Sequence, residues 1–492
     1  MDQPDEFDPY AQNELGIVAP PKSLLAALRK IGPGIILAGS IVGTGELLLT
    51  TSLGAEYGFA FLWLILFSCV VKVFIQIELG RYALSSGEPT LAALNKLPGW
   101  RFGAHWLVWW WFIMLLFTVS QLGAMAGGVG QALNLAFPGV TPRIAAQLQS
   151  FAPGLAVTLR ERPEHPWAIM TALVAILLLL SGGYRRIEFI TTFLVAGVTF
   201  VTVACVALLP SMGYGVGLDD IRQGFSLDLL TLPAGAIAAA FGAFGITGVG
   251  ASELYAYPYW CLEKGYGRYT GPRNGSPEWA DRARGWLRVM YLDAWVSMLV
   301  FTVATVAFYI LGATVLHRQG LVPEKSQMIA TLSEMYVPTF GAWTKIVFLI
   351  GAWAVLFKTL YVASASNSRL TADFLGLARF VRYTSAADRA KWIRRCCTFY
   401  PLLGIAWYLW LRDPRAMTIL GGFVQAATLP IISAAAIFLR YRRLDPRLAP
   451  SKWSDACLWL AFLSITAVAL YAVPNWLLHD AWPALFGSPG AK

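Results

Sequence analysis

Apolar stretches recur along the chain, and each of about eleven is long enough to cross a lipid bilayer as a helix. A segment inside the bilayer must satisfy its backbone hydrogen bonds internally, so stretches of this kind restrict the fold to helices. Hydrophobic residues make up 57% of the 492 residues and charged residues 13%, which excludes a soluble enzyme. We therefore predict an all-α polytopic membrane protein with about 11 transmembrane helices. The stretches cover about 33 to 57, 60 to 80, 104 to 135, 166 to 183, 187 to 210, 233 to 260, 287 to 316, 343 to 368, 393 to 411, 416 to 439 and 454 to 473.

The positions of Lys and Arg predict how the chain is oriented, because cytoplasmic loops collect these residues. Lys22, Arg29 and Lys30 precede the first stretch, and every second loop after it is basic. One loop on the opposite side is acidic, at Asp219 and Asp220. We therefore expect a bacterial inner (plasma) membrane protein with a cytoplasmic N-terminus and, because the number of spans is odd, an external C-terminus. The formal net charge of +10 then reflects topology and attraction to anionic lipid, and predicts no nucleic-acid partner.

A short pattern of glycine and glutamate occurs twice, each time inside an apolar stretch. Val-Gly-Thr-Gly-Glu-Leu occupies residues 42–47, and Val-Gly-Ala-Ser-Glu-Leu occupies residues 249–254. A carboxylate far from the membrane surface is costly, and glycine-weakened segments at matching places in two halves are typical of a transporter's central site. Glu46 and Glu253 are therefore candidate substrate ligands. In the alternative interpretation, the glycines serve close helix packing and each glutamate is a protonated, hydrogen-bonded carboxyl group.

Glycines at mid-depth predict that the first and sixth spans unwind. Unwound backbone persists in a membrane only where it lines protein or a water cavity, and it frees carbonyl oxygens. With the two glutamates, these oxygens form a site suited to a hard cation such as Mg²⁺, Mn²⁺ or Ca²⁺. Neither six-residue segment contains Met, Cys or His, so the pattern does not favour a soft metal. The candidate substrate-binding residues in and beside these two segments are Ser40, Gly43, Thr44, Glu46, Thr247, Gly250, Ser252 and Glu253, with Glu46 and Glu253 as the metal ligands.

Several motifs resemble the Nramp family of metal transporters. They are Gly32-Pro33-Gly34, Gly54-Ala55-Glu56-Tyr57-Gly58-Phe59 followed by Leu62-Trp63, then Gln76, Arg81, Ser86-Gly87, Asp293 and Leu429-Pro430. The resemblance implies a LeuT-type core of two inverted five-helix repeats, with the first and sixth helices broken around the metal. It implies a cytoplasmic segment at 1–30, repeats at 31–211 and 233–440, and an extra eleventh helix with a short external tail at 441–492. The family also places a glutamine in the tenth helix that reaches the metal when the site closes. Gln425 lies about one helical turn from that place and is therefore a further candidate substrate-binding residue.

The chain departs from the family at both breaks. Family members carry Asp-Pro-Gly-Asn and Met-Pro-His-Asn, where this chain has Gly43-Thr44-Gly45-Glu46 and Gly250-Ala251-Ser252-Glu253. The metal-binding aspartate and methionine of the family are thus both glycine, and both asparagines are glutamate. Loss of a thioether and gain of negative charge favour a hard cation, with Mg²⁺ or Mn²⁺ first and a trivalent ion such as Fe³⁺ or Al³⁺ open.

The residues that couple protons in the family are also replaced. Family members use acidic residues in the third helix and a histidine in the sixth. Gln121 and Ala124 take the acidic positions here, and Ser252 takes the histidine position. We therefore expect alternating-access transport without proton coupling. The alternative is that Glu46 or Glu253 itself exchanges a proton for the metal.

Four further charges lie within the predicted spans. Lys358 is near the middle of the eighth span, which a LeuT-type core brings beside the first helix. It is either a charge-compensating group that neutralises a glutamate until metal binds, or a lysine that snorkels to the interface or pairs structurally. Lys72 and Glu78 lie nearer the predicted cytoplasmic end, so snorkelling and the neighbouring Arg81 account for them. Asp293 is expected to cap or pair near a helix end.

Two other functions stay open beside metal transport. A transporter for an organic cation such as a diamine would clamp its ligand between the two glutamates, and Tyr255, Tyr257 and Tyr259 offer aromatic faces. A non-transporting metal sensor is weakened because no sizeable soluble domain follows the last span. No nucleophile elbow, phosphate loop or metal-hydrolase motif supports an enzyme. We predict a monomer without a cofactor, whose partners are the bilayer and the transported cation.

Overall fold

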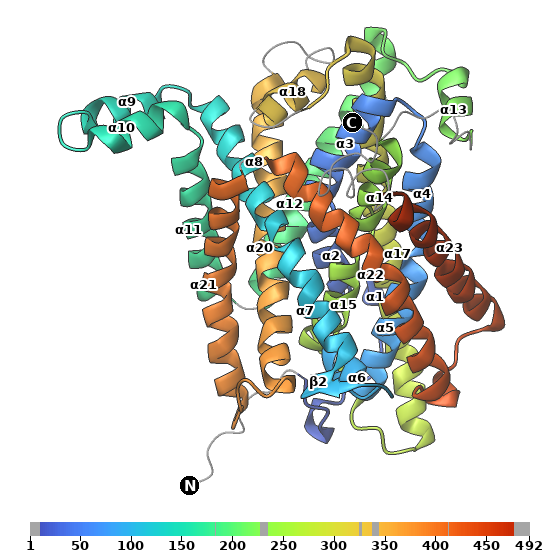
Figure 1. The fold of residues 1–492 in the computed structure, drawn as a ribbon. Helices are drawn as coiled ribbons and strands as arrows, with labels where there is room; N and C mark the ends of the chain where they lie inside the picture. The colour runs from blue at the N-terminus through green and yellow to red at the C-terminus, as the bar shows by residue number, and fades with distance from the viewer. Residues whose placement is uncertain are drawn as a thin grey trace, which may run out of the picture.

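Helices form almost the whole protein, as the apolar stretches predict (Figure 1). The computed structural model describes residues 10–182, 184–226, 235–323, 327–336, 344–411 and 413–476. Within them, the strands are β1 (Arg101–Phe102) and β2 (Ala104–His105), which pair as a short antiparallel hairpin. The chain ends at 1–9 and 477–492 lie outside the described residues, as do the first residues of the stretches expected from 233 and from 343. The all-α prediction is confirmed.

The helical elements follow one another with short connections. The first half contains η1 (Glu14–Gly16), α1 (Leu24–Leu28), α2 (Pro33–Ile41), the π-helix η2 (Thr44–Thr50), α3 (Thr51–Tyr57), α4 (Leu62–Val71), α5 (Val73–Ser86), α6 (Thr90–Asn95), α7 (Trp106–Thr118), α8 (Ser120–Ala136), α9 (Val140–Leu148), α10 (Pro153–Glu161), α11 (His165–Ser181), α12 (Tyr184–Leu208), η3 (Leu209–Met212) and α13 (Leu218–Gly224). The second half contains α14 (Ala236–Ile246), α15 (Ala251–Lys264), α16 (Tyr266–Thr270), α17 (Pro277–Leu311), the π-helix η4 (Gly312–Leu316), η5 (His317–Gln319), α18 (Met328–Ser333), η7 (Glu334–Tyr336), α20 (Thr344–Leu377), α21 (Ala386–Leu411), α22 (Pro414–Arg442), η8 (Pro446–Leu448) and α23 (Lys452–Trp476).

Nine segments of the described residues are long and apolar enough to cross a membrane. Counting the pair α10 and α11, which is bent by 91°, as one span gives ten. The stretch expected at 393–411 forms α21 but carries Arg394 and Arg395, and it is not among the ten. The count of about 11 spans therefore stays a prediction, and so does the division into two repeats at 31–211 and 233–440. The nine are Pro33–Tyr57, Leu62–Ser86, Trp106–Ala136, Arg185–Met212, Ala236–Lys264, Pro277–Gln319, Phe348–Leu377, Pro414–Arg442 and Lys452–Pro474.

The two broken helices lie at the centre of the bundle. The most apolar window of Pro33–Tyr57 is 88% buried, whereas those of Arg185–Met212 and Lys452–Pro474 are 24% and 28% buried. Figure 1 shows α2 and α15 in the middle, α23 at one edge, and α9 and α10 projecting beside α11. Residues in the central helices are therefore enclosed by protein, while the outer helices present apolar side chains to lipid.

Two of the charges inside the spans are paired as predicted. Asp293 on α17 accepts the backbone N–H groups of Gly32 and Gly34 at 2.8 and 2.6 Å, at the start of α2. Glu78 Oε2 lies 3.1 Å from Arg81 Nε on the same helix. A carboxylate at a helix N-terminus is favoured by the helix dipole, so Asp293 fixes where the first span begins.

Lys72 corrects the sequence-based interpretation. Its side chain is fully buried, and its Nζ donates to the carbonyl oxygens of Phe244 and Thr247 at 2.5 and 2.7 Å. Snorkelling toward the membrane surface is therefore wrong for this residue. The reason is that the sixth span ends its first half beside Lys72, and its free carbonyl groups attract the ammonium.

Candidate functional site

The first span is broken between α2 and η2, where Val42 and Gly43 leave helical geometry. The Glu46 side chain bonds the backbone of the break, because its Oε2 accepts the Gly43 N–H at 3.2 Å. Its Oε1 accepts the hydroxyl of Thr305 on α17, also at 3.2 Å. A Cβ on Gly43 would collide with the Thr359 hydroxyl, so glycine lets α20 approach the break closely. The fully buried Glu46 carboxylate is thus turned toward α17.

The sixth span is broken between α14 and α15. Gly248 has a φ of 66°, in the left-handed region that favours glycine. Gly250 leaves room for two oxygen atoms, since a Cβ there would lie 2.6 Å from Glu253 Oε2 and 2.7 Å from Gln425 Oε1. The N–H of Ser252 donates to that same Gln425 oxygen at 3.0 Å. The start of α15 therefore holds a carboxylate and an amide oxygen beside each other.

Ser40 on α2 links the two breaks. Its hydroxyl donates to Glu253 Oε1 at 2.9 Å. Glu253 sits in the first turn of α15, where the helix dipole favours a negative charge. The Glu253 carboxylate is therefore oriented by the N-terminal end of α15 and held by Ser40 on α2.

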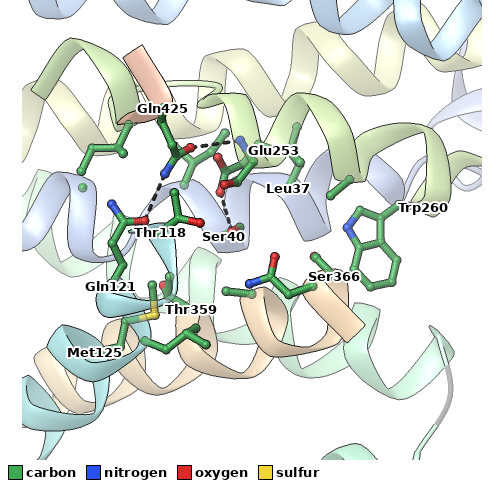
Figure 2. A pocket seen from close by; sticks show the side chains of 18 residues that line it. Leu37, Ser40, Thr118, Gln121, Met125, Glu253, Trp260, Thr359, Ser366 and Gln425 are labelled. Carbon is green, nitrogen blue, oxygen red and sulfur yellow. Dashed lines mark hydrogen bonds between the residues drawn. The ribbon is translucent and has the colours of Figure 1, made fainter. Parts of the chain in front are cut away.

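A cavity lies between the breaks, and Figure 2 shows Glu253, Ser40 and Gln425 around it. It leaves about 40 Å³ for the centres of water molecules, which is room for roughly three waters. Glu253 carries the only ionisable side chain among the described residues of the wall. The polar lining residues are Ser40, Thr118, Gln121, Ser252, Glu253, Thr359, Ser366, Asn367 and Gln425.

A chain of amide groups fixes the part of the cavity wall that Gln425 and Gln121 form. Gln425 Nε2 on α22 donates to Gln121 Oε1 on α8 at 3.0 Å, and Gln121 Nε2 donates to the Thr418 carbonyl at 3.3 Å. These bonds direct Gln425 Oε1 toward the Ser252 N–H and the cavity. Since amides do not titrate, this orientation is the same at any physiological pH.

The structure brings some of the predicted site residues together and separates others. Ser40, Ser252, Glu253 and Gln425 line the cavity, with Gly250 directly behind Glu253. Instead of two opposing carboxylates, the cavity receives one. The predicted site residues outside its lining are Glu46, Gly43, Thr247 and Lys358, and the side chain of Thr44 lies outside the described part of the structure.

The two glutamates diverge because the chain continues differently after each break. Glu46 lies in a π-helix and bonds Thr305, whereas Glu253 lies in an α-helix and bonds Ser40. Thr247 is tied to Thr50 by a hydroxyl contact of 3.1 Å behind the cavity. Lys358 is fully buried and donates to backbone carbonyls of α2, so snorkelling is wrong for it as well.

Sequence reasoning missed several residues of the wall. Met125 on α8 brings a thioether to the cavity, and Trp260 on α15 forms one end of it (Figure 2). Thr359, Ser366 and Asn367 come from α20. The polar run in the eighth span was the available signal for the α20 residues, whereas Met125 lies in a stretch with no distinguishing pattern.

The cavity is suited to one small cation surrounded by oxygen atoms. Carboxylate, amide and hydroxyl oxygens are the ligands that hard cations take in proteins. No cluster of three or more His, Cys, Asp or Glu side chains occurs in the part of the chain that the structure describes. A bound cation would therefore meet one formal negative charge, which permits binding that is weak enough for release. Tyr255, Tyr257 and Tyr259 do not line the cavity, so its aromatic face comes from Trp260 alone among the described residues.

Comparisons with known proteins agree on one family. Residues 34–474 match the family described as natural resistance-associated macrophage protein-like, Nramp. The divalent metal cation transporter MntH of Xanthomonas campestris is 23% identical over 454 residues, covering 89% of this chain and 89% of that protein. MntH of Acidiphilium cryptum is 24% identical over 425 residues, covering 84% of this chain and 82% of that protein. The structure of a manganese transporter variant from Eremococcus coleocola matches with a TM-score of 0.63 at 15% identity, covering 98% of this chain and 92% of that one. The resemblance seen in the motifs and the predicted fold are thereby confirmed.

Proposed function

Because the chain belongs to the Nramp family of integral membrane proteins, we propose that it transports a divalent metal cation across the membrane by alternating access. The relatives named above are divalent metal cation transporters and a manganese transporter. The observation that carries the proposal is the Glu253 carboxylate, which faces an oxygen-lined cavity between two broken helices. Half-helix ends around a central cavity are where transporters of this architecture bind their substrates.

Mg²⁺ and Mn²⁺ are the proposed substrates. Glu253 Oε1 and Oε2, Gln425 Oε1 and the Ser40 hydroxyl supply hard oxygen ligands, and the remaining positions are taken by water in the cavity. One carboxylate offsets less charge than two, which disfavours the trivalent ions that a two-glutamate site would admit. A diamine carries an ammonium group at each end and would need two carboxylates, whereas Glu253 is the one carboxylate among the described residues of the cavity wall.

Transport is proposed to proceed without proton coupling. The bonds from Ser252 through Gln425 to Gln121 contain only amide and backbone groups. Ser252 takes the position of the family's histidine and Gln121 that of an acidic residue, so this part of the cavity wall offers no proton relay. Exchange of a proton at Glu253 is the competing route.

The chain is proposed to lie in a bacterial inner membrane with its N-terminus in the cytoplasm. Contacts between loops support the predicted sidedness. The basic loops assigned to one side meet each other, since Arg443 donates to the Lys96 carbonyl and Arg447 to the Gly275 carbonyl. Loops assigned to the other side also meet, through Arg318 and Asp220 at 2.7 Å.

Metal uptake into liposomes tests the proposal. Purified protein would be offered Mg²⁺, Mn²⁺, Ca²⁺, Fe²⁺ and a trivalent ion, with a pH indicator inside. Uptake of Mg²⁺ or Mn²⁺ that is lost in Glu253→Gln and kept in Glu161→Gln, a control at an exposed glutamate, is the expected result. Unchanged uptake in Glu253→Gln overturns the site, and saturable putrescine uptake without a metal response overturns the substrate class.

Glu46→Gln distinguishes the role of Glu46 in metal binding from that of Glu253. Because Glu46 bonds Gly43 and Thr305 outside the cavity lining, its amide variant is expected to keep the metal affinity within a few-fold of the wild type. Loss of affinity equal to that of Glu253→Gln would restore a site with both glutamates as ligands. Internal acidification that follows metal entry would overturn the uncoupled mechanism.

A further inference from the structure

Lys358 caps the carbonyl end of the first half of the first broken helix. Its ammonium group donates to the Gly39 carbonyl at 2.7 Å and to the Val42 carbonyl. The lysine comes from α20, and none of its side chain is exposed. The Thr359 hydroxyl also points to the Gly39 carbonyl, at 3.4 Å. Two carbonyl groups at the end of α2 are therefore satisfied by a cation that belongs to another helix.

Lys72 does the same at the sixth helix. It lies at the junction of α4 and α5, and its ammonium donates to the Phe244 and Thr247 carbonyls at the end of α14. The Ser68 hydroxyl bonds the same two carbonyls, at 3.2 and 2.9 Å. Lys72 is also fully buried. At both breaks, a buried lysine ammonium therefore bonds the carbonyl end of the first half-helix, and the two lysines come from unrelated parts of the sequence.

The charges are divided between helix ends and are not paired with each other. At each break, a lysine bonds the carbonyl end of the first half, and a glutamate lies in the first turn of the second half. No ion pair joins these two lysines to these two glutamates in the described part of the chain. This is the arrangement that the helix dipole favours, with cations at C-terminal ends and carboxylates at N-terminal ends.

Carbonyl ends of broken helices are cation sites in transporters. Half-helix C-terminal ends and unwound carbonyl groups coordinate the Na⁺ or H⁺ that is transported together with the substrate. Here each such end already holds an ammonium group, which has the charge of Na⁺ and satisfies two carbonyls at once. A free monovalent cation would have to displace a buried lysine to bind there.

We propose that Lys72 and Lys358 are tethered cations that replace a co-transported monovalent ion at both breaks, so that the metal cation is the only ion the cycle requires. The transport part of this inference rests on the proposed function. The assignment of the two lysines as tethered cations rests on their contacts with the carbonyl groups. Both residues are positioning residues, because their ammonium groups hold the half-helices in the geometry that Glu253 needs and do not line the cavity.

The wild-type protein gives the first test. Metal uptake into liposomes is expected to be equal in Na⁺, K⁺ and choline buffers of the same ionic strength. Uptake that requires Na⁺ or K⁺ would overturn the proposal without the need for any variant.

Lys358→Ala gives the second test, because it removes the ammonium and leaves space for a small cation. Uptake in choline buffer is expected to fall by about 10- to 100-fold, the worth of lost hydrogen bonds to a charged group. Addition of Na⁺ or methylammonium is expected to restore most of it. Lys391→Ala, which removes an exposed lysine from α21, is the control and should respond to neither cation. If neither cation restores the metal uptake of Lys358→Ala, Lys358 is only a structural cap of α2 and the proposal is overturned.

Thermal unfolding separates this inference from the proposed function. Methylammonium or Na⁺ is expected to raise the Tm of Lys358→Ala and of Lys72→Ala, and to leave that of the wild type unchanged. This readout needs no metal flux, so it stands if the transported substrate is different. If neither variant is stabilised by either cation, the tethered-cation assignment is wrong even where metal uptake is confirmed.

Discussion

Gly250→Ala is the sharpest perturbation that the candidate site allows, because it adds one methyl group behind the proposed ligands. That methyl carbon would lie 2.6 Å from Glu253 Oε2 and 2.7 Å from Gln425 Oε1. Ordinary contact begins at 3.4 Å, so both oxygens must retreat by about 0.7 to 0.8 Å. The Ser252 N–H, now 3.0 Å from Gln425 Oε1, then loses its acceptor.

The cost is expected to appear in metal affinity. An extra methyl group in a packed site costs about 1 to 3 kcal/mol. The empty protein relieves this strain by moving the Gln425 amide away, whereas the metal-bound protein needs both oxygens in place. The affinity is therefore expected to fall by about 5- to 150-fold, as 1.4 kcal/mol is tenfold.

Calorimetric titration with Mn²⁺ measures this effect directly, and a thermal unfolding scan shows whether the variant is folded. Gly351→Ala is the matched control, because a Cβ at that position of α20 meets no atom within 4 Å. It should bind Mn²⁺ like the wild type. A Gly250→Ala protein with wild-type affinity would refute the reasoning that Glu253 and Gln425 are the ligands.

Three further predictions concern other parts of the chain. Asp293→Asn replaces one of the two carboxylate oxygens that accept N–H groups at the start of α2 with an amide donor. The free energy of unfolding, measured by heat or denaturant, should therefore fall by about 1 to 3 kcal/mol. A hydrogen bond from Arg447 lowers the pKa of Asp445 from 3.8 to about 2. The stability that the ionised Asp445 adds is complete above pH 4 and is lost as the pH falls toward 2. The Tm difference between the wild type and Asp445→Asn should therefore be constant above pH 4 and vanish between pH 4 and pH 2. Met125→Leu keeps the volume and removes the thioether, so uptake of Mg²⁺ should stay within about twofold while a soft competitor such as Cd²⁺ inhibits less; equal inhibition by Cd²⁺ would mean that the thioether does not reach the ion.

The positions of the helix breaks could be predicted from the sequence. Glycines inside apolar stretches leave the backbone free to unwind, and the structure breaks both spans at Gly43 and between Gly248 and Gly250. Gln425 is expected instead from the resemblance to the family, because it lies in an unbroken helix. Ser252 stands beside a break in the sequence, so it could be predicted together with the break. These inferences need only the order of residues along one helix.

The direction of Glu46 could not be predicted in this way. Glu46 and Glu253 have the same offset from a glycine, which suggests the same facing. The type of helix that follows the break decides where the glutamate side chain points, because a π-helix rotates by fewer degrees per residue than an α-helix. Thr305, which fixes Glu46, lies far along the chain on α17. Which hydroxyl meets which carboxylate is a property of packing between helices, and no local pattern contains it.

The lysines extend the same argument to charge. Glu46, Glu253, Lys72 and Lys358 all lie in apolar stretches of the sequence, and the natural inference is that these opposite charges pair. In the structure each charge meets a helix end, with Lys358 and Lys72 on carbonyl groups and Glu46 on the N–H of Gly43. Breaking a helix creates ends of opposite partial charge inside the membrane, and each end needs a partner there. The breaks therefore account for these four buried charges, and Glu253 differs from the other three because it also faces the cavity.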